Sequence, residues 1–112
     1  MNYDVKMMLS IYGTSEFDWL GDIVTDVNKL TRHHIVKKEN GGENGISNYA
    51  LLTPKSHHLV NMLEEQEPEV FEQINAMFLE LNRSIQPPTQ AYYDKIKKIL
   101  KVNNIGLYQR RK

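Results

Sequence analysis

The stretch from Thr31 to Asn61 constrains the fold of this chain more than any other, because it combines a strand–loop–strand–helix pattern with all four histidines of the sequence. Apolar and β-branched residues predict strands over residues 30–38 and 49–53. The loop between them is rich in glycine and asparagine, which accept the positive φ angles of tight turns. A Thr-Pro pair then favours a helix over residues 54–66, with the threonine as N-cap. The segment is therefore expected to fold as two antiparallel strands and a helix.

The histidines form two adjacent pairs whose members cannot share one task. Neighbouring residues on a strand point to opposite faces, so His33 and His34 are expected to have different roles. On the predicted helix, His57 and Asn61 are four residues apart and share a face, whereas His58 is rotated away by about 100°. Either His57 with Asn61, or His58 alone, can therefore approach a metal ion beside the strands. Imidazole both accepts protons near neutral pH and ligates divalent ions, which are two of the tasks in phosphodiester hydrolysis.

The spacing of these residues resembles that of a nuclease motif. The His33-His34 doublet is followed by a variable loop, by Asn48, and by His57 nine residues after that asparagine. This order resembles the HNH endonuclease motif, also called the ββα-metal or His-Me finger, over residues 30–62. The run Y-A-L-L-T-P-K-S before His57 is similar to the apolar strand and T-P-K-x-H turn of colicin-type DNases. The resemblance implies a metal-dependent endonuclease that cuts DNA.

The resemblance also implies a role for each residue of the motif. His33 and His57 match the two metal ligands, and Asn61 lies where the colicin class has a further histidine, as a weak or water-mediated ligand. His34 matches the general base that activates water. Asn48 matches the residue that hydrogen-bonds the loop backbone and holds the base in position. The expected cofactor is one divalent ion, with Zn, Ni or Mn suited to imidazole and Mg suited to a site whose other ligands are waters.

Several positions depart from the pattern of the family. Lys37 stands where many HNH proteins have a proline, and Thr31 stands where bacteriocin nucleases have an acidic residue. Thr53 and Ser56 stand where many members carry a zinc-binding CxxC pair, and the chain contains no cysteine. No residue matches the upstream catalytic arginine of the bacteriocin nucleases, although Arg32 is close. Neither a structural zinc held by cysteines nor a disulfide is therefore expected.

Outside the motif, the apolar spacing predicts mostly helices. A capping box favours a short helix over residues 16–28, while the apolar residues at 7–11 fit either a strand or a helix. The clearest 3.6-residue period begins at Pro68, which opens a long amphipathic helix. Thr89 is the expected cap of a last helix, and residues 102–112 are expected to form a short strand or a tail.

The bulk properties fit one domain covering residues 1–112, large enough for a modest core. No run of about eighteen apolar residues is present, so no membrane partner is expected. The N-terminus lacks a basic stretch followed by an apolar one, and nothing there indicates secretion. The absence of cysteine fits a reducing cytoplasm, which is the expected location.

Charge is unevenly distributed along a chain whose formal net charge is zero. Residues 60–82 carry six glutamates and no base, whereas residues 83–112 carry eight bases and one aspartate. These bases either neutralise nucleic-acid phosphates or form solvated faces that balance the acidic helices. The first interpretation, joined to the bases near the motif, gives these candidate nucleic-acid contacts: Arg32, Lys37, Lys38, Lys55, Lys97, Lys98, Arg110 and Arg111.

These patterns together predict an α+β, mainly helical protein with a central ββα-metal (HNH) finger and flanking helices. The expected function is hydrolysis of phosphodiester bonds in DNA, with His34 as base and one divalent ion as cofactor. One alternative is a non-cleaving nucleic-acid- or protein-binding module built on the same fold. Another is an interaction domain stabilised by a zinc ion on His33, His57 and His58, whose folding would depend on metal.

Overall fold

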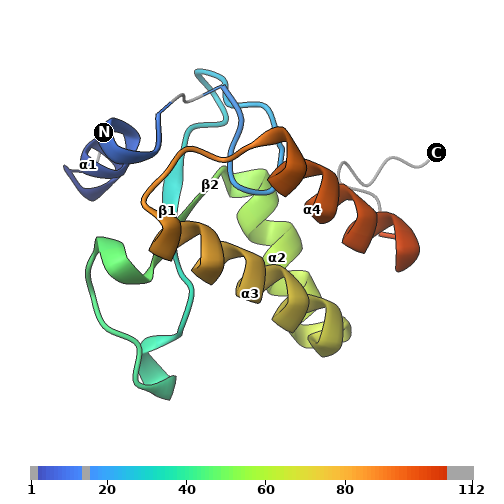
Figure 1. The fold of residues 1–112 in the computed structure, drawn as a ribbon. Helices are drawn as coiled ribbons and strands as arrows, with labels where there is room; N and C mark the ends of the chain where they lie inside the picture. The colour runs from blue at the N-terminus through green and yellow to red at the C-terminus, as the bar shows by residue number, and fades with distance from the viewer. Residues whose placement is uncertain (1–2, 14–15, 106–112) are drawn as a thin grey trace.

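The computed structural model describes residues 3–13 and 16–105, where four helices lie around a small two-stranded antiparallel sheet (Figure 1). The architecture is α+β and mainly helical, as the sequence predicted. Two short 3₁₀ turns, Lys38–Asn40 and Ile46–Asn48, lie in the loop that joins the strands. The main elements are α1 (Tyr3–Tyr12), β1 (Thr31–His34), β2 (Tyr49–Leu52), α2 (Pro54–Gln66), α3 (Pro68–Ser84) and α4 (Gln90–Val102).

The two strands pair in a register that places His33 opposite Ala50 and His34 opposite Tyr49. β1 ends earlier than the predicted strand over 30–38, because the backbone of Val36 is held by a side chain of the loop instead of by β2. All four residues of β2 are buried, so both faces of this strand are covered. β2 is therefore the inner strand, whereas β1 leaves Arg32 exposed, and the sheet lies between α1 and the α2–α3 pair (Figure 1).

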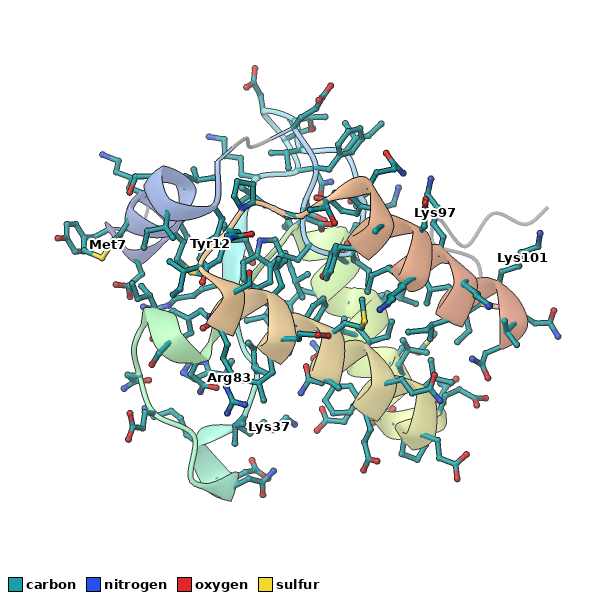
Figure 2. The ribbon with its side chains drawn as sticks, viewed as in Figure 1. Met7, Tyr12, Lys37, Arg83, Lys97 and Lys101 are labelled. Atoms are coloured by element: carbon teal, nitrogen blue, oxygen red, sulfur yellow. The ribbon has the colours of Figure 1, made fainter. Side chains whose placement is uncertain are left out.

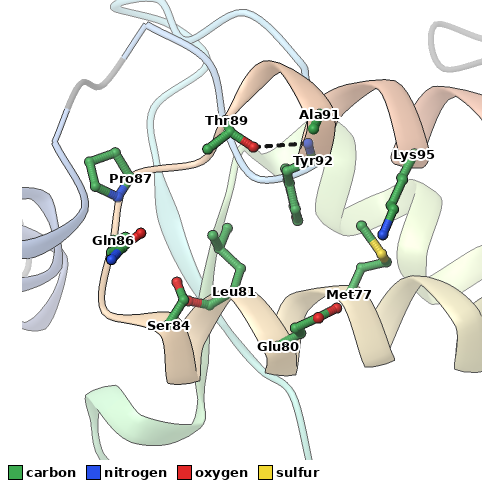
Figure 3. Close-up of a pocket in the computed structure, with 10 residues that line it drawn as sticks. All are labelled: Met77, Glu80, Leu81, Ser84, Gln86, Pro87, Thr89, Ala91, Tyr92 and Lys95. Atoms are coloured by element: carbon green, nitrogen blue, oxygen red, sulfur yellow. Dashed lines mark hydrogen bonds between the residues drawn. The ribbon is translucent and has the colours of Figure 1, made fainter.

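Two helices, α2 and α4, begin where their caps were predicted. The Thr53 hydroxyl accepts a hydrogen bond from the Ser56 amide at 3.2 Å, and α2 has the predicted bounds. The Thr89 hydroxyl accepts one from the Tyr92 amide at 3.1 Å and caps α4 in the same way (Figure 3). Among the described residues, no helix is both long and apolar enough to cross a membrane. The apolar face of α3 buries Val70, Ile74, Phe78 and Leu81.

The helix predicted over residues 16–28 is wrong, since this segment forms turns and two isolated β-bridges. The buried carboxylate of Asp18 accepts hydrogen bonds from the amides of Leu20 and Asp22, both at 2.9 Å, and so closes a turn in place of helical bonds. Its other oxygen accepts from the Thr53 amide at 2.9 Å. The segment is thereby fastened to the start of α2, a contact that local periodicity does not reveal.

The two ends of the chain settle other predictions. Residues 7–11, where strand and helix were both open, belong to α1. For residues 102–112 a short strand and a tail were both open. Val102 still belongs to α4 and residues 103–105 form no strand, so the strand alternative is wrong over that part. The rest of that segment, including the candidate contacts Arg110 and Arg111, lies outside the described residues.

Candidate functional site

An open hollow of about 300 Å³ lies where β1, α2 and the start of the inter-strand loop meet. It holds the predicted metal ligands, the predicted base and three of the predicted phosphate contacts. The hollow is therefore the place where the sequence-based site is assembled from separate elements. Its lining consists of Arg32, His33, His34, Lys37, Lys38, Glu39, His57 and Asn61.

His33 and His57 come together from β1 and α2. Their ring centroids are 5.2 Å apart and the rings are nearly perpendicular, at 82°. His33 is 6% exposed and its ring also packs against Phe78 of α3, with centroids 5.9 Å apart. Burial lowers the pKa of His33 to about 4 and also lowers the pKa of His57. Both imidazoles are therefore neutral at neutral pH, which is the form that ligates a metal.

The face of α2 that carries His57 also brings Asn61 into the hollow, as the four-residue spacing predicted. His58 is exposed and does not line the hollow. Among the described residues, no group of three or more His, Cys, Asp or Glu side chains is placed to hold a metal ion. The structural zinc site on His33, His57 and His58 therefore finds no support, and the candidate ligands are two imidazoles and one amide.

His34 lies on the other side of β1 from His33, as strand alternation requires. Its ring meets the Tyr49 ring edge-on, with centroids 5.0 Å apart, and its Nε2 is 3.0 Å from Oδ1 of Asn44. An amide oxygen only accepts, so Nε2 is the donor of this pair, and in the neutral form of the ring the lone pair is then on Nδ1. Because His34 is only half-buried, its ring can meet a solvent-borne ligand in the hollow.

Asn48 braces the loop that carries these groups. Its Oδ1 accepts a hydrogen bond from the Val36 amide, and its Nδ2 donates to the carbonyls of Val36 and Glu43, all at 2.9 Å. Gly42 lies where a Cβ atom would be 1.8 Å from the Val36 carbonyl oxygen, so only glycine fits this turn. Asn48 thus joins Val36, two residues after His34, to the returning part of the loop at Glu43.

Two asparagines of α3 also hold this loop and were not singled out from the sequence. Nδ2 of Asn75 donates to the Ile35 carbonyl, and Nδ2 of Asn82 donates to the carbonyls of Ile46 and Tyr49. The two asparagines are seven residues apart, and so share a face of the helix. The sequence did contain a signal for them: two polar side chains at helical spacing beside the apolar stripe of the helix. Amides buried at such positions need hydrogen-bond partners.

The basic candidates divide between the hollow and other surfaces. Arg32 forms an ion pair with Asp4 of α1, and its guanidinium lies 5.1 Å from the centre of the Tyr49 ring. Lys37 pairs with Glu64 at 2.8 Å, and Lys38 is exposed.

Of the remaining basic candidates, the three that lie in the described part of the chain, Lys55, Lys97 and Lys98, do not line the hollow. Lys55 instead lines a different one, together with Asp22 and Asn28. Lys97 lies on α4, well away from Lys37 at the loop (Figure 2), and Lys98 follows it on the same helix. The two lysines of α4 can therefore reach nucleic acid only as a surface separate from the hollow.

A second hollow, of about 230 Å³, lies between α3 and α4 (Figure 3). Met77, Leu81 and Tyr92 line it together with Glu80 and Lys95. None of its lining residues is a histidine, so it lacks a group that exchanges protons readily near neutral pH. The hollow beside β1 is the stronger candidate for chemistry.

Comparison of this chain with family models, with curated proteins and with solved structures finds no match. A functional proposal for this protein therefore rests on the residues of the motif and on the geometry of the site.

Proposed function

We propose that this protein is a metal-dependent endonuclease of the HNH type that hydrolyses phosphodiester bonds in DNA. The observation that carries the proposal is the meeting of His33 and His57, with ring centroids 5.2 Å apart, in a hollow that His34 also lines. Asn48 supports it further, because all its side-chain hydrogen bonds hold the loop beside His34. Both features are what the HNH resemblance implies.

In this proposal His34 is the general base. Its Nε2–H is held by Asn44, so the lone pair on Nδ1 can accept a proton from water. His33 and His57 would hold a divalent ion, and Asn61 would contribute its amide oxygen directly or through water. Two or three protein ligands leave positions open, as in catalytic rather than structural sites. When bound, the ion supplies stabilisation of charge on the phosphate and on the leaving oxygen.

The test is nicking of supercoiled plasmid by the purified protein with Mg, Mn, Ni or Zn, each compared with a chelator control. We expect at least one ion to convert the plasmid to the open-circle form, and excess chelator to stop the reaction. A second plasmid assay with the double variant His33→Ala/His57→Ala identifies contaminating nuclease, because it should be inactive with every ion. No nicking with any of the four ions would contradict the proposal.

One observation favours the rival function, a binding module that does not cut. The candidate ligands are two imidazoles and one amide. His34 and Glu39 also line the hollow, but among the described residues no three His, Cys, Asp or Glu side chains are placed to hold one metal ion. Such a site holds metal weakly unless the substrate completes it. Binding of a labelled duplex in a gel-shift assay, together with no nicking under any metal, would select this rival.

The bases beside the histidines should control the salt dependence of DNA binding. We expect Lys38→Gln to lower the slope of log affinity against log salt by about one, because one phosphate contact is lost. The matched double variant Lys97→Gln/Lys98→Gln should leave the slope unchanged, since α4 does not line the hollow. Fluorescence anisotropy of a labelled duplex over a salt series measures both. A reduced slope in the α4 variant alone would move the DNA surface to the C-terminal helix.

A further inference from the structure

We propose that Asn75 is a positioning residue for His33, which it fixes in the Nε2–H tautomer so that Nδ1 is the nitrogen offered to a divalent ion. The proposal rests on the proposed function, because it names how one ligand of that site is prepared. Asn75 belongs to α3 and lies outside the strand–loop–strand–helix segment. It is therefore an addition to the site that the sequence motif describes.

The Asn75 amide has a fixed orientation. Its Nδ2 donates to the Ile35 carbonyl oxygen, two residues after His33. A carbonyl oxygen only accepts hydrogen bonds, so the NH₂ group of Asn75 must face Ile35. The opposite atom of the amide, Oδ1, then faces Nε2 of His33 at 3.3 Å. The backbone carbonyl of Ile35, directly after β1, thereby fixes which end of the amide meets the imidazole.

The orientation of the amide decides the tautomer of the ring. An amide oxygen cannot donate, so the Nε2 atom of His33 must carry the hydrogen of this pair. In a neutral imidazole only one nitrogen carries a hydrogen, which leaves the lone pair on Nδ1. A histidine that ligates a metal through one nitrogen almost always donates from the other to an oxygen, and that partner fixes the tautomer and the orientation of the ring.

Packing prevents the His33 ring from rotating out of this orientation. The ring is buried between Phe78 of α3 and His57 of α2, with centroids 5.9 and 5.2 Å away. Asn75 and Phe78 are three residues apart on α3, so one helix face supplies both the hydrogen-bond partner and the apolar wall. A flipped ring would leave the Asn75 oxygen without a donor in a part-buried place, which is costly.

The first measurement is made on the wild-type protein without metal. Long-range ¹H–¹⁵N correlation spectra of the imidazoles, recorded above pH 7, distinguish the two neutral tautomers by their nitrogen shifts. We expect His33 to be in the Nε2–H form. A spectrum showing His33 in the Nδ1–H form would overturn the proposal whatever the behaviour of any variant.

The second measurement compares three variants. Asn75→Leu removes the acceptor and should give a mixture of tautomers, with Zn²⁺ affinity by calorimetry about tenfold weaker. Asn75→Asp keeps an oxygen acceptor and should retain the Nε2–H form. The control is Asn82→Leu, which removes equivalent backbone hydrogen bonds at the other end of the loop. It should leave the His33 tautomer as in wild type.

These outcomes separate the inference from the nuclease proposal. An unchanged tautomer and unchanged Zn²⁺ affinity in Asn75→Leu would overturn the positioning role even if the wild-type protein nicks plasmid. An equal change in Asn82→Leu would overturn it as well, since a general loosening of the loop would then explain both. The expected tautomer in a protein that never nicks plasmid would reject the nuclease alone.

Discussion

His34→Ala should lower the rate of plasmid nicking about 10²- to 10⁴-fold, because it removes the proposed general base. Metal affinity should be nearly unchanged in this variant. The structure separates the two tasks: His34 lies against Tyr49 and Asn44, whereas His33 meets His57 on the other side of the strand. Nicking rates at saturating metal, with calorimetry of the same preparations, measure both quantities.

His57→Ala should show the opposite pattern. Metal affinity should fall at least about tenfold, since even the loss of a group that only supports a ligand has that effect. Added metal should then restore part of the nicking activity in His57→Ala but none in His34→Ala. His58→Ala is the matched control, because it removes an exposed imidazole from the same turn of α2. Equal loss of metal affinity in His34→Ala and His57→Ala would mean that the base and a ligand have been assigned in reverse.

The features of the site that depend on short sequence separations were predictable. Alternation along a strand separates His33 from His34, and the four-residue helical period joins His57 to Asn61. The start of α2 followed from Thr53 and its proline, because capping is a local interaction. Pairing of the strands brings these local pieces to one hollow, and a two-stranded hairpin beside a helix allows few other arrangements.

The supporting contacts were not predictable, because they join residues far apart in the sequence. Asn75 reaches Ile35 across 40 residues, and Asp18 reaches Thr53 across 35. Residues 16–28 show the consequence: their apolar spacing fits a helix, but the Asp18 carboxylate forms a turn fastened to α2 instead. Local periodicity carries no information on such partners.

The positions of the basic residues on the surface could not be predicted, for the same reason. A charge count along the chain groups Lys97 and Lys98 with the other C-terminal bases, but it does not show which face of the molecule α4 occupies. In the fold they lie apart from the histidine hollow, where Arg32 and Lys37 are already paired with acids. Phosphate binding by Arg32 or Lys37 would therefore require displacement of Asp4 or Glu64 from these pairs, whereas Lys38 is exposed.

The metal-free protein should lose about 3 kcal/mol of stability through His33 as the pH falls from 6.5 to about 4. Burial lowers the pKa of His33 to about 4, against 6.5 for a free histidine. Above pH 6.5 both the folded and the unfolded chain hold this imidazole neutral, and its contribution to stability is complete. Below 6.5 the unfolded chain gains a proton that the folded chain excludes until about pH 4. At about 1.4 kcal/mol per pH unit, this window gives the stated loss.

The experiment must isolate one histidine, because other groups titrate in the same range. His57 acts in the same direction as His33, since burial lowers its pKa too. Asp18 acts in the opposite direction, because burial raises its pKa and the folded chain takes up that proton first. The comparison is therefore between wild type and His33→Leu, an apolar replacement that suits contact with Phe78.

Urea unfolding at pH 7 and pH 4.5 measures the loss of stability in both proteins. At about 1.4 kcal/mol per pH unit, wild type should lose at least 1 to 2 kcal/mol more than His33→Leu over this interval. Equal losses in the two proteins would mean that His33 is not held neutral in the fold, and would remove the support that burial gives to its role as a ligand.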